Sequence, residues 1–206
     1  MTATDAWVGI VDDEESVRRA VTDLLESAGF RAQAFASGRA FLESPAADGP
    51  PCCLILDVRL AGASGLEFQQ ELKRAGFAIP IVFITGHGDI PMAVQAMKGG
   101  AVDFLAKPFR DQELLDAINR AIARGQAERE LRAEIVKVQE RFDELTPRER
   151  EVMRFVVQGW LNKQIASELG MSETTVKVHR GQVMRKMQAD SLPDLVRMAD
   201  KLASLP

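Results

Sequence analysis

The stretch CCLILD, residues 52–57, consists of five apolar residues followed by an aspartate. Three other short, mostly apolar runs in the first 110 residues also end at polar side chains: Ala6–Val11 before Asp12, Ile79–Ile84 before Thr85, and Ala101–Ala106 before Lys107. Continuous apolar runs are typical of strands that are covered on both faces, as in a parallel sheet. We therefore expect these runs to be the strands of such a sheet.

Segments with helical periodicity lie between these runs. The clearest has Val17, Val21 and Leu24 on one face and stops at Gly29. Alternating strands and helices predict an open α/β fold. We expect five parallel strands in flavodoxin-like order, with the second near Arg31–Phe35.

The composition is that of a folded, soluble protein, with 46% apolar and 27% charged residues. At 206 residues the chain suits one large domain or two small ones. No stretch approaches the roughly 20 apolar residues that a membrane helix needs. Met1–Asp5 lacks the features of a signal peptide, so we expect a cytoplasmic protein. Cys52 and Cys53 are adjacent, which favours buried core residues over disulfides or metal ligands.

The net charge of −4 is unevenly distributed along the chain. Residues 1–110 have a balance of −4 and residues 111–145 a balance of −3, whereas residues 146–206 carry ten Lys and Arg against seven Asp and Glu. A basic segment in an otherwise acidic chain indicates contact with nucleic acid in that segment.

Residues 111–145 contain no proline and predict one long helix, with Gly125 as a candidate break. Five apolar residues in this helix are spaced four and three apart, which is the a/d pattern of a coiled coil: Leu131, Ile135, Val138, Phe142 and Leu145. The helix is either a dimerising connector between two domains or a helix that packs on its own domain.

Residues 146–206 predict a small all-α domain of four helices. Thr146 and Glu149 form a capping box, and Pro147 stands at the first helical position. The helices are expected over residues 147–158, 162–169, 173–187 and 194–203, with Gly159 and Gly170 just after two helix ends.

Five polar residues follow the predicted strands: Asp12, Asp13, Asp57, Thr85 and Lys107. Ligands of open α/β sheets bind at the carboxyl ends of the strands, so we expect these residues to meet at one edge. Three neighbouring carboxylates repel one another and favour a hard divalent cation, Mg²⁺ or Mn²⁺. Asp57 could accept a phosphoryl group as an acyl phosphate, while Lys107 and Thr85 contact the phosphoryl oxygens.

Residues 6–123 resemble two-component receiver domains in four features: the Asp12-Asp13 pair, Asp57 with Gly62 and Gly65 after it, Thr85-Gly86, and Lys107-Pro108. The resemblance implies that Asp57 accepts phosphoryl from a sensor histidine kinase. It implies a Mg²⁺ site made by Asp12, Asp13, Asp57 and the backbone carbonyl of Arg59. It also implies a cis peptide bond before Pro108 and an aromatic switch residue, Phe104, that responds to Thr85.

Some positions near the site vary within this family. Arg59 and His87 occupy positions that tune dephosphorylation, and Ala61 stands where the family often has proline. His87 is interpreted as lining the mouth of the pocket and not as a general base. The string ITGHGDIPM, residues 84–92, is most similar to FixJ and the styrene-response regulators.

A helix over Glu173–Met187 would place Val176, His179, Val183 and Met187 on one stripe that faces the core. His179 is therefore interpreted as a packed core residue. The opposite face carries Thr174, Lys177, Val178, Gly181 and Arg185. Its Lys and Arg side chains can meet phosphates or guanine edges, Val178 suits a thymine methyl group, and Gly181 would let the backbone approach the groove closely. Arg180 lies on the flank, where its charged head can meet a phosphate.

Residues 145–187 resemble the LuxR/NarL-type helix-turn-helix through Thr146–Glu149, Asn162–Ala166 and Val176–Arg180. The resemblance implies that Lys163–Leu169 is the first helix of the motif and Glu173–Met187 the recognition helix. Relatives often carry a basic residue where Gly181 stands. The expected DNA contacts are Lys163, Thr174, Lys177, Val178, Arg180 and Arg185.

We therefore expect a response regulator of the FixJ/NarL family, with a receiver over residues 1–123, a helical linker over 124–144 and a DNA-binding domain over 145–206. Phosphorylation should remodel Asp89–Lys98, Ala101–Ala106 and Asp111–Ala123. The protein would then dimerise or release its DNA-binding domain, and regulate transcription as an activator. We expect no enzymatic activity beyond its own phosphorylation and dephosphorylation.

Three alternatives stay open. An aspartyl-phosphate phosphatase would need a second aspartate just after Asp57, where Val58 and Arg59 stand. A receiver that ignores phosphate is disfavoured by the complete set of Asp, Thr and Lys residues. An output domain that binds protein or RNA is disfavoured by the basic face of Lys177–Arg185.

Overall fold

The computed structural model describes residues 7–44, 49–86 and 90–203. The chain divides into two compact units, Met1–Glu128 and Arg129–Pro206. His87, predicted to line the mouth of the pocket, and Asp89, the start of a segment expected to be remodelled, lie outside the described residues.

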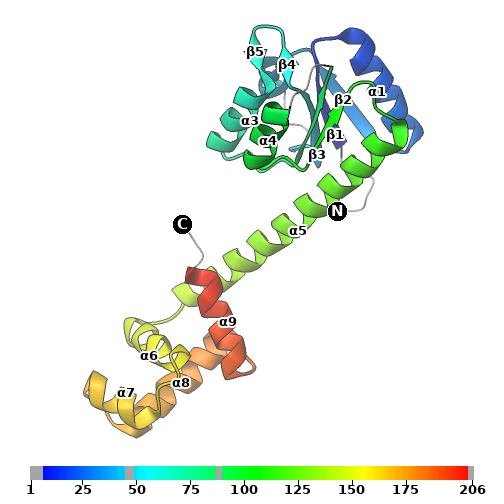
Figure 1. The fold of residues 1–206 in the computed structure, drawn as a ribbon. Helices are drawn as coiled ribbons and strands as arrows, with labels where there is room; N and C mark the ends of the chain where they lie inside the picture. Colours follow the sequence, from blue (N-terminus) through cyan, green and yellow to red (C-terminus); the bar gives the residue numbers. More distant parts are fainter. Residues whose placement is uncertain (1–6, 45–48, 87–89, 204–206) are drawn as a thin grey trace. The chain divides into compact units, whose positions relative to one another are not determined.

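The first unit is built on a five-stranded parallel sheet, as predicted (Figure 1). The strand order β2-β1-β3-β6-β7 is the flavodoxin-like order, in which β1 lies between β2 and β3. The strands are β1 (Trp7–Val11), β2 (Arg31–Phe35), β3 (Cys53–Asp57), β6 (Ile81–Thr85) and β7 (Asp103–Ala106). All residues of β1, β3 and β6 are buried, which explains their continuous apolar runs.

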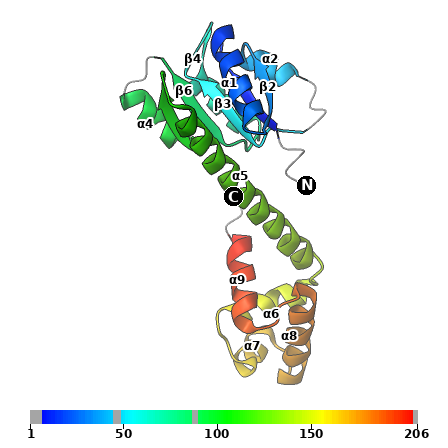
Figure 2. The ribbon, with the colours of Figure 1, turned by 90° about the vertical axis from the view of Figure 1, so that its right-hand side faces the viewer.

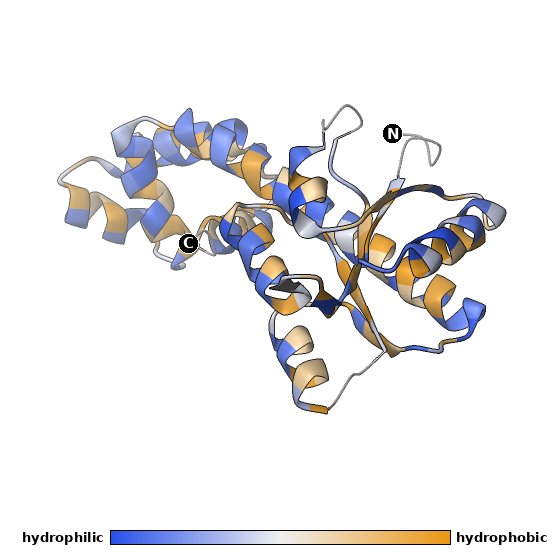
Figure 3. Ribbon diagram, turned by 90° about the horizontal axis from the view of Figure 1, so that it is seen from above, coloured by the Kyte–Doolittle hydropathy of each residue, from blue (hydrophilic) through white to orange (hydrophobic). Residues whose placement is uncertain are grey.

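Helices cover both faces of this sheet (Figure 2). One core cluster joins the sheet to α2 (Gly38–Glu43), α3 (Gly65–Arg74) and α4 (Ile90–Lys98). The other joins it to α1 (Glu15–Ser27) and the first turns of α5 (Asp111–Asp143). Figure 3 shows hydrophobic strands between helices that are hydrophobic on one side only. Cys52 and Cys53 form no disulfide among the described residues and are buried in the second cluster, as predicted.

A short two-stranded antiparallel ribbon follows β3 and was not predicted. It pairs β4 (Arg59–Leu60) with β5 (Ala63–Ser64). Gly62, with φ of +80°, supplies the left-handed residue of the turn between them. Strands of two residues are too short to leave a periodic pattern in a sequence.

The long helix α5 runs without a break from Asp111 to Asp143, so the candidate break at Gly125 is wrong. Three members of the predicted a/d pattern, Val138, Phe142 and Leu145, pack in the core of the second unit. Leu131, by contrast, is 51% exposed. The carboxyl-terminal part of the pattern therefore belongs to the core of its own domain, which is one of the two expected readings.

The second unit consists of the end of α5 and four further helices around one core. They are α6 (Pro147–Val157), α7 (Asn162–Leu169), α8 (Glu173–Met187) and α9 (Leu192–Ala203). The predicted capping box is present, because Glu149 accepts a hydrogen bond from the Thr146 backbone at 2.8 Å and donates its own N–H to Thr146 Oγ1 at 3.3 Å. Gly159 and Gly170 have φ of +82° and +64°, as expected after helix ends.

Helix α9 begins two residues earlier than predicted. The Ser191 hydroxyl accepts a hydrogen bond from the Asp194 N–H at 3.3 Å, so Ser191 caps the helix and Pro193 falls in the first turn, where proline is tolerated. Among the described helices, none is both long and apolar enough to cross a membrane.

Candidate functional site

Strand register brings the predicted polar residues to one edge of the sheet. Val11 pairs with Leu56, so Asp12 and Asp57 follow neighbouring positions on β1 and β3. Asp57 pairs with Ile84, which places Thr85 one step further on β6. Thr85 pairs with Ala106 on β7, and the N–H of Lys107 donates to the carbonyl of Thr85 at 2.7 Å.

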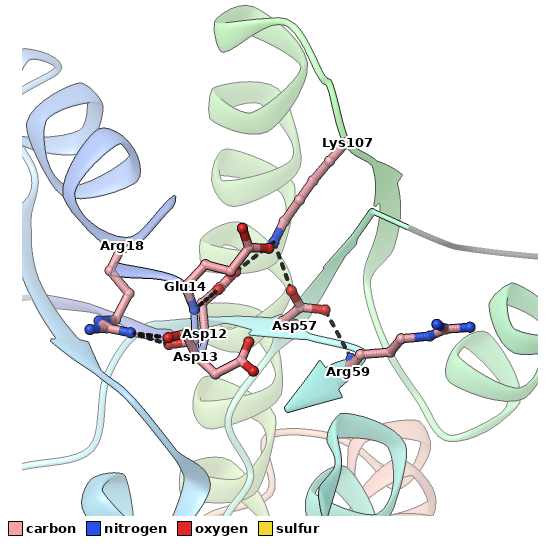
Figure 4. A network of polar contacts seen from close by, with 7 residues as sticks. All are labelled: Asp12, Asp13, Glu14, Arg18, Asp57, Arg59 and Lys107. Carbon is pink, nitrogen blue, oxygen red and sulfur yellow. Dashed lines mark hydrogen bonds and ion pairs between the residues drawn. The ribbon is translucent and has the colours of Figure 1, made fainter. Parts of the chain in front are cut away.

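The side chain of Lys107 lies between two carboxylates. Its Nζ is 2.7 Å from Oδ2 of Asp12 and 2.7 Å from Oδ2 of Asp57 (Figure 4). The side chains of Asp12 and Asp57 are 0% and 6% exposed, and that of Lys107 is 15% exposed. Such low exposure means that the ammonium group replaces water as the partner of both carboxylates.

The three aspartates have the donor set of a hard metal ion. Ligand oxygens of Asp12, Asp13 and Asp57 all lie within 4.8 Å of one another. Backbone N–H groups orient the two buried carboxylates: Glu14 donates to Oδ1 of Asp12 at 2.8 Å, and Arg59 donates to Oδ1 of Asp57 at 2.9 Å. Oxygen donors of this kind suit Mg²⁺ or Mn²⁺, so the residues fit a divalent cation.

Burial raises the pKa of the Asp57 carboxyl above its ordinary 3.8, although hydrogen bonds from Lys107 and from the Arg59 backbone oppose the effect. Burial would lower the pKa of Lys107, but hydrogen bonds and the charges of Asp12 and Asp57 outweigh it and raise that pKa. Lys107 therefore stays a cation at neutral pH. Burial therefore destabilises the ionised form of Asp57, and a further cation in the site would stabilise that form.

Gly65 lets the start of α3 lie against the end of β3. A Cβ atom at this position would be 2.0 Å from the backbone oxygen of Asp57, a distance that no side chain can occupy. The N–H of Gly65 donates to the carbonyl of Val58 at 2.8 Å. This close approach explains why a glycine follows Asp57 at that spacing.

The other residues expected near the site lie on β6, on β7 and in the segments that follow β3 and β7. Thr85 is fully buried, and Phe104 is partly buried with its ring centroid 6.4 Å from that of Phe83. The Lys107–Pro108 peptide bond is cis, as expected. In Figure 4 the side chain of Arg59 leads away from Asp57, so this residue meets the site through its backbone.

Sequence reasoning missed two residues of this network. Arg18 of α1 donates to the backbone carbonyls of Asp12 and Asp13, and Glu14 lies 3.8 Å from the Lys107 ammonium (Figure 4). An arginine on an otherwise polar helix face gives no signal, because its target here is backbone and not another side chain.

The second unit presents helix α8 with the two faces that were predicted. Val176, Val183 and Met187 are fully buried, and His179 is partly buried on the same stripe. The residues of the opposite face are all exposed: Thr174, Lys177, Val178, Gly181 and Arg185. Val178 on this face is 57% exposed.

Two of the expected contacts have partners within the unit: Arg185 donates to the Gln182 side chain on the same helix, and Arg180 reaches a different helix. Nη1 of Arg180 donates to Oδ1 of Asn162 at 2.8 Å, which ties α8 to the start of α7. Lys163, next to Asn162, is exposed. The two helices of the expected motif are thus joined by a hydrogen bond as well as by their core.

The five-stranded sheet with three aspartates and a lysine at one edge defines a receiver, and the second unit has the size and helix order of a DNA-binding domain. Residues 8–119 match the family described as response regulator receiver domain, and residues 143–199 match bacterial regulatory proteins, luxR family. The chain belongs to the two-component response regulators that join a receiver to a LuxR-type DNA-binding domain.

Whole-chain relatives have the same two-part organisation. The chain is 54% identical over 200 residues to Nodulation protein W of Bradyrhizobium diazoefficiens, covering 97% of this chain and 88% of that protein. It is 45% identical over 196 residues to the transcriptional regulatory protein FixJ of Rhizobium meliloti, covering 95% and 96%.

Solved structures agree. The response regulator StyR has a TM-score of 0.79 at 45% identity, covering 95% of this chain and 98% of that one. Full-length FixJ from B. japonicum has a TM-score of 0.58 at 40% identity, covering 98% of each chain. The predicted family, fold class and general function are confirmed.

The raised pKa of Asp57 leads to a prediction about stability. In metal-free buffer at pH 7, Asp57→Asn should raise the melting temperature, because the wild-type carboxylate is ionised at a cost. The advantage of the variant should shrink as the pH falls through the pKa of Asp57 in the folded protein towards 3.8, because the wild type then binds the proton that its fold favours. Thermal unfolding in EDTA at several pH values measures this.

Asp23→Asn, which changes an exposed carboxylate on α1, is the control and should alter stability by no more than about 0.5 kcal/mol. A wild-type protein that is more stable than Asp57→Asn at pH 7 would contradict the prediction.

Proposed function

We propose that the protein takes a phosphoryl group from a sensor histidine kinase on Asp57 and uses it to control a DNA-binding domain. The observation that carries the proposal is the buried position of Asp57, with Lys107 at 2.7 Å on one oxygen and Asp12 and Asp13 beside it. The proposed domains are a receiver over residues 1–123, a linker over 124–144 and the DNA-binding domain over 145–206.

In the proposed reaction a carboxylate oxygen of Asp57 attacks the phosphorus atom. The bond between phosphorus and the kinase imidazole breaks, and an acyl phosphate forms on Asp57. Lys107 stabilises charge on the phosphoryl oxygens, and the Thr85 hydroxyl donates a hydrogen bond to one of them. Asp12, Asp13, Asp57 and the backbone carbonyl of Arg59 would hold Mg²⁺ or Mn²⁺, which neutralises phosphoryl charge when bound.

The proposed switch begins at Thr85. Thr85 moves towards the phosphoryl group, and the Phe104 ring, which is only partly buried, turns into the space that Thr85 leaves. This movement remodels the surface formed by α4, β7 and the start of α5, where Ile90 is 81% exposed and Val94 is 44% exposed. The protein then dimerises through that surface or releases its DNA-binding domain.

The proposed output is transcriptional activation in the cytoplasm, where the DNA lies. A dimer would present two α8 helices to two half-sites about one DNA turn apart. Lys163, Thr174, Lys177, Val178, Arg180 and Arg185 would contact the duplex. The chemistry of the receiver would be limited to its own phosphorylation and dephosphorylation, because Val58 and Arg59 offer no second carboxylate after Asp57.

Response to a small phosphodonor tests the proposal. With acetyl phosphate and Mg²⁺, the wild-type chain should dimerise and bind DNA more tightly, since the acyl phosphate on Asp57 drives both changes. Asp57→Asn should do neither. Analytical ultracentrifugation and fluorescence anisotropy with labelled operator DNA, selected from a random pool, measure the two effects. Equal stimulation of Asp57→Asn, or no response of the wild type, would refute the proposed coupling.

The exposed face of α8 yields a separate prediction. Lys177→Ala should weaken DNA binding by about 1–3 kcal/mol if Lys177 reads a base, with loss of preference at one position, or reduce the salt dependence by about one unit if it contacts a phosphate. Lys137→Ala removes the same charge from an exposed position on α5 and serves as the control. Equal affinities of Lys177→Ala and the wild type over a range of salt concentrations would exclude Lys177 from the interface.

A further inference from the structure

Arg18 donates two hydrogen bonds to the backbone of the loop that carries Asp12 and Asp13. One guanidinium nitrogen, Nη1, donates to the backbone carbonyl of Asp12 at 2.8 Å and to that of Asp13 at 2.9 Å. Figure 4 shows Arg18 reaching the loop from the side opposite to Lys107 and Asp57. Arg18 therefore contacts the acidic loop without entering the site.

Asp12 has further anchors that do not involve Arg18. Its N–H donates to the carbonyl of Phe35 at 3.2 Å, and its carboxylate accepts bonds from the Glu14 N–H and the Lys107 ammonium. Loss of Arg18 would leave all three of these bonds in place. Asp12 should therefore keep its position without the guanidinium.

Asp13 is in a different situation. It is exposed, and within the part of the chain that the structure describes, its hydrogen bond from Arg18 is the only polar contact it makes. The carbonyl and the side chain of a residue share one Cα, so a bond that fixes the carbonyl also restricts where the carboxylate can point. The position of the Asp13 carboxylate thus depends on Arg18 far more than that of Asp12 does.

We infer that Arg18 is a positioning residue that orders Asp13 as a ligand of the divalent cation. The inference rests on the proposed metal site and adds to it a group that contacts neither metal nor phosphoryl. Partners that orient metal ligands from outside the coordination shell commonly contribute about 10-fold to about 100-fold in metal affinity. Without Arg18, the Asp13 loop would have to be ordered by the metal itself, at a cost in conformational entropy.

A purely electrostatic role for Arg18 predicts the opposite result. The guanidinium is a positive charge near a site for a divalent cation, so its removal would relieve repulsion and tighten metal binding. Positioning predicts weaker binding after removal. The sign of the change therefore separates the two roles.

The test is the affinity of the unphosphorylated full-length chain for Mn²⁺, measured from the electron paramagnetic resonance signal of the free ion. Arg18→Met keeps an unbranched aliphatic stem and a similar helix propensity but removes both hydrogen bonds from Nη1. We expect it to weaken Mn²⁺ binding about 10-fold, the lower end of the range for such partners. Arg19→Met, at the exposed neighbouring position on α1, is the matched control and should bind as the wild type does.

The same substitution in an Asp13→Asn background shows whether Arg18 acts through Asp13. If it does, Arg18→Met should have almost no additional effect there, because the ligand that it positions is already gone. An undiminished effect in that background, or an affinity of Arg18→Met equal to or tighter than that of the wild type, would overturn the inference.

Two controls keep the result decisive. The melting temperature in EDTA shows whether Arg18→Met is folded at the assay temperature. If it is not, Arg18→Lys decides, since it keeps a cation but replaces the planar guanidinium by a single ammonium; binding as tight as the wild type would overturn the inference. If the wild type binds no Mn²⁺, or binds it equally well as Asp57→Asn and Asp13→Asn, the proposed metal site itself fails.

Discussion

The ammonium group of Lys107 is 2.7 Å from a carboxylate oxygen of Asp12 and 2.7 Å from one of Asp57, and all three side chains are largely removed from water. Two buried carboxylates side by side would repel each other strongly without this cation. The two ion pairs of Lys107 require β1, β3 and β7 to end at the same edge of the sheet. The parallel topology provides this, because every strand of the sheet points its carboxyl end the same way.

The rest of the site follows from the same constraint. Gly65 allows α3 to begin directly against the carbonyl of Asp57, and the Arg59 N–H orients the carboxylate from the other side. Burial raises the pKa of Asp57 even with Lys107 present, so the pocket has capacity for more positive charge. The divalent cation proposed for Asp12, Asp13 and Asp57 would supply that positive charge.

The sequence predicted the sheet and the convergence of polar residues because both depend on local patterns. Apolar runs that end in Asp57, Thr85 and Lys107 indicate strands, and strand ends in a parallel sheet meet. It did not decide between the two roles of the long helix, because spacing four and three apart suits a coiled coil as well as a domain core. The packing of Val138, Phe142 and Leu145 against the second unit depends on contacts distant in sequence.

Other features left no periodic signal. The β4–β5 ribbon has two residues per strand, and the contact of Arg18 with backbone carbonyls does not depend on the type of side chain at its target. The hydrogen bond from Arg180 to Asn162 was likewise hidden, because an arginine on a helix flank looks the same whether it faces DNA or a neighbouring helix.

The proposed role of Asp57 as phosphoacceptor is tested by the intact mass of the chain after incubation with acetyl phosphate and Mg²⁺. The wild type should gain one phosphoryl group that hydroxylamine removes, as expected for an acyl phosphate, and Asp57→Asn should gain none. No gain of mass on the wild type, or the same hydroxylamine-sensitive gain on Asp57→Asn, would show that Asp57 is not the phosphoacceptor.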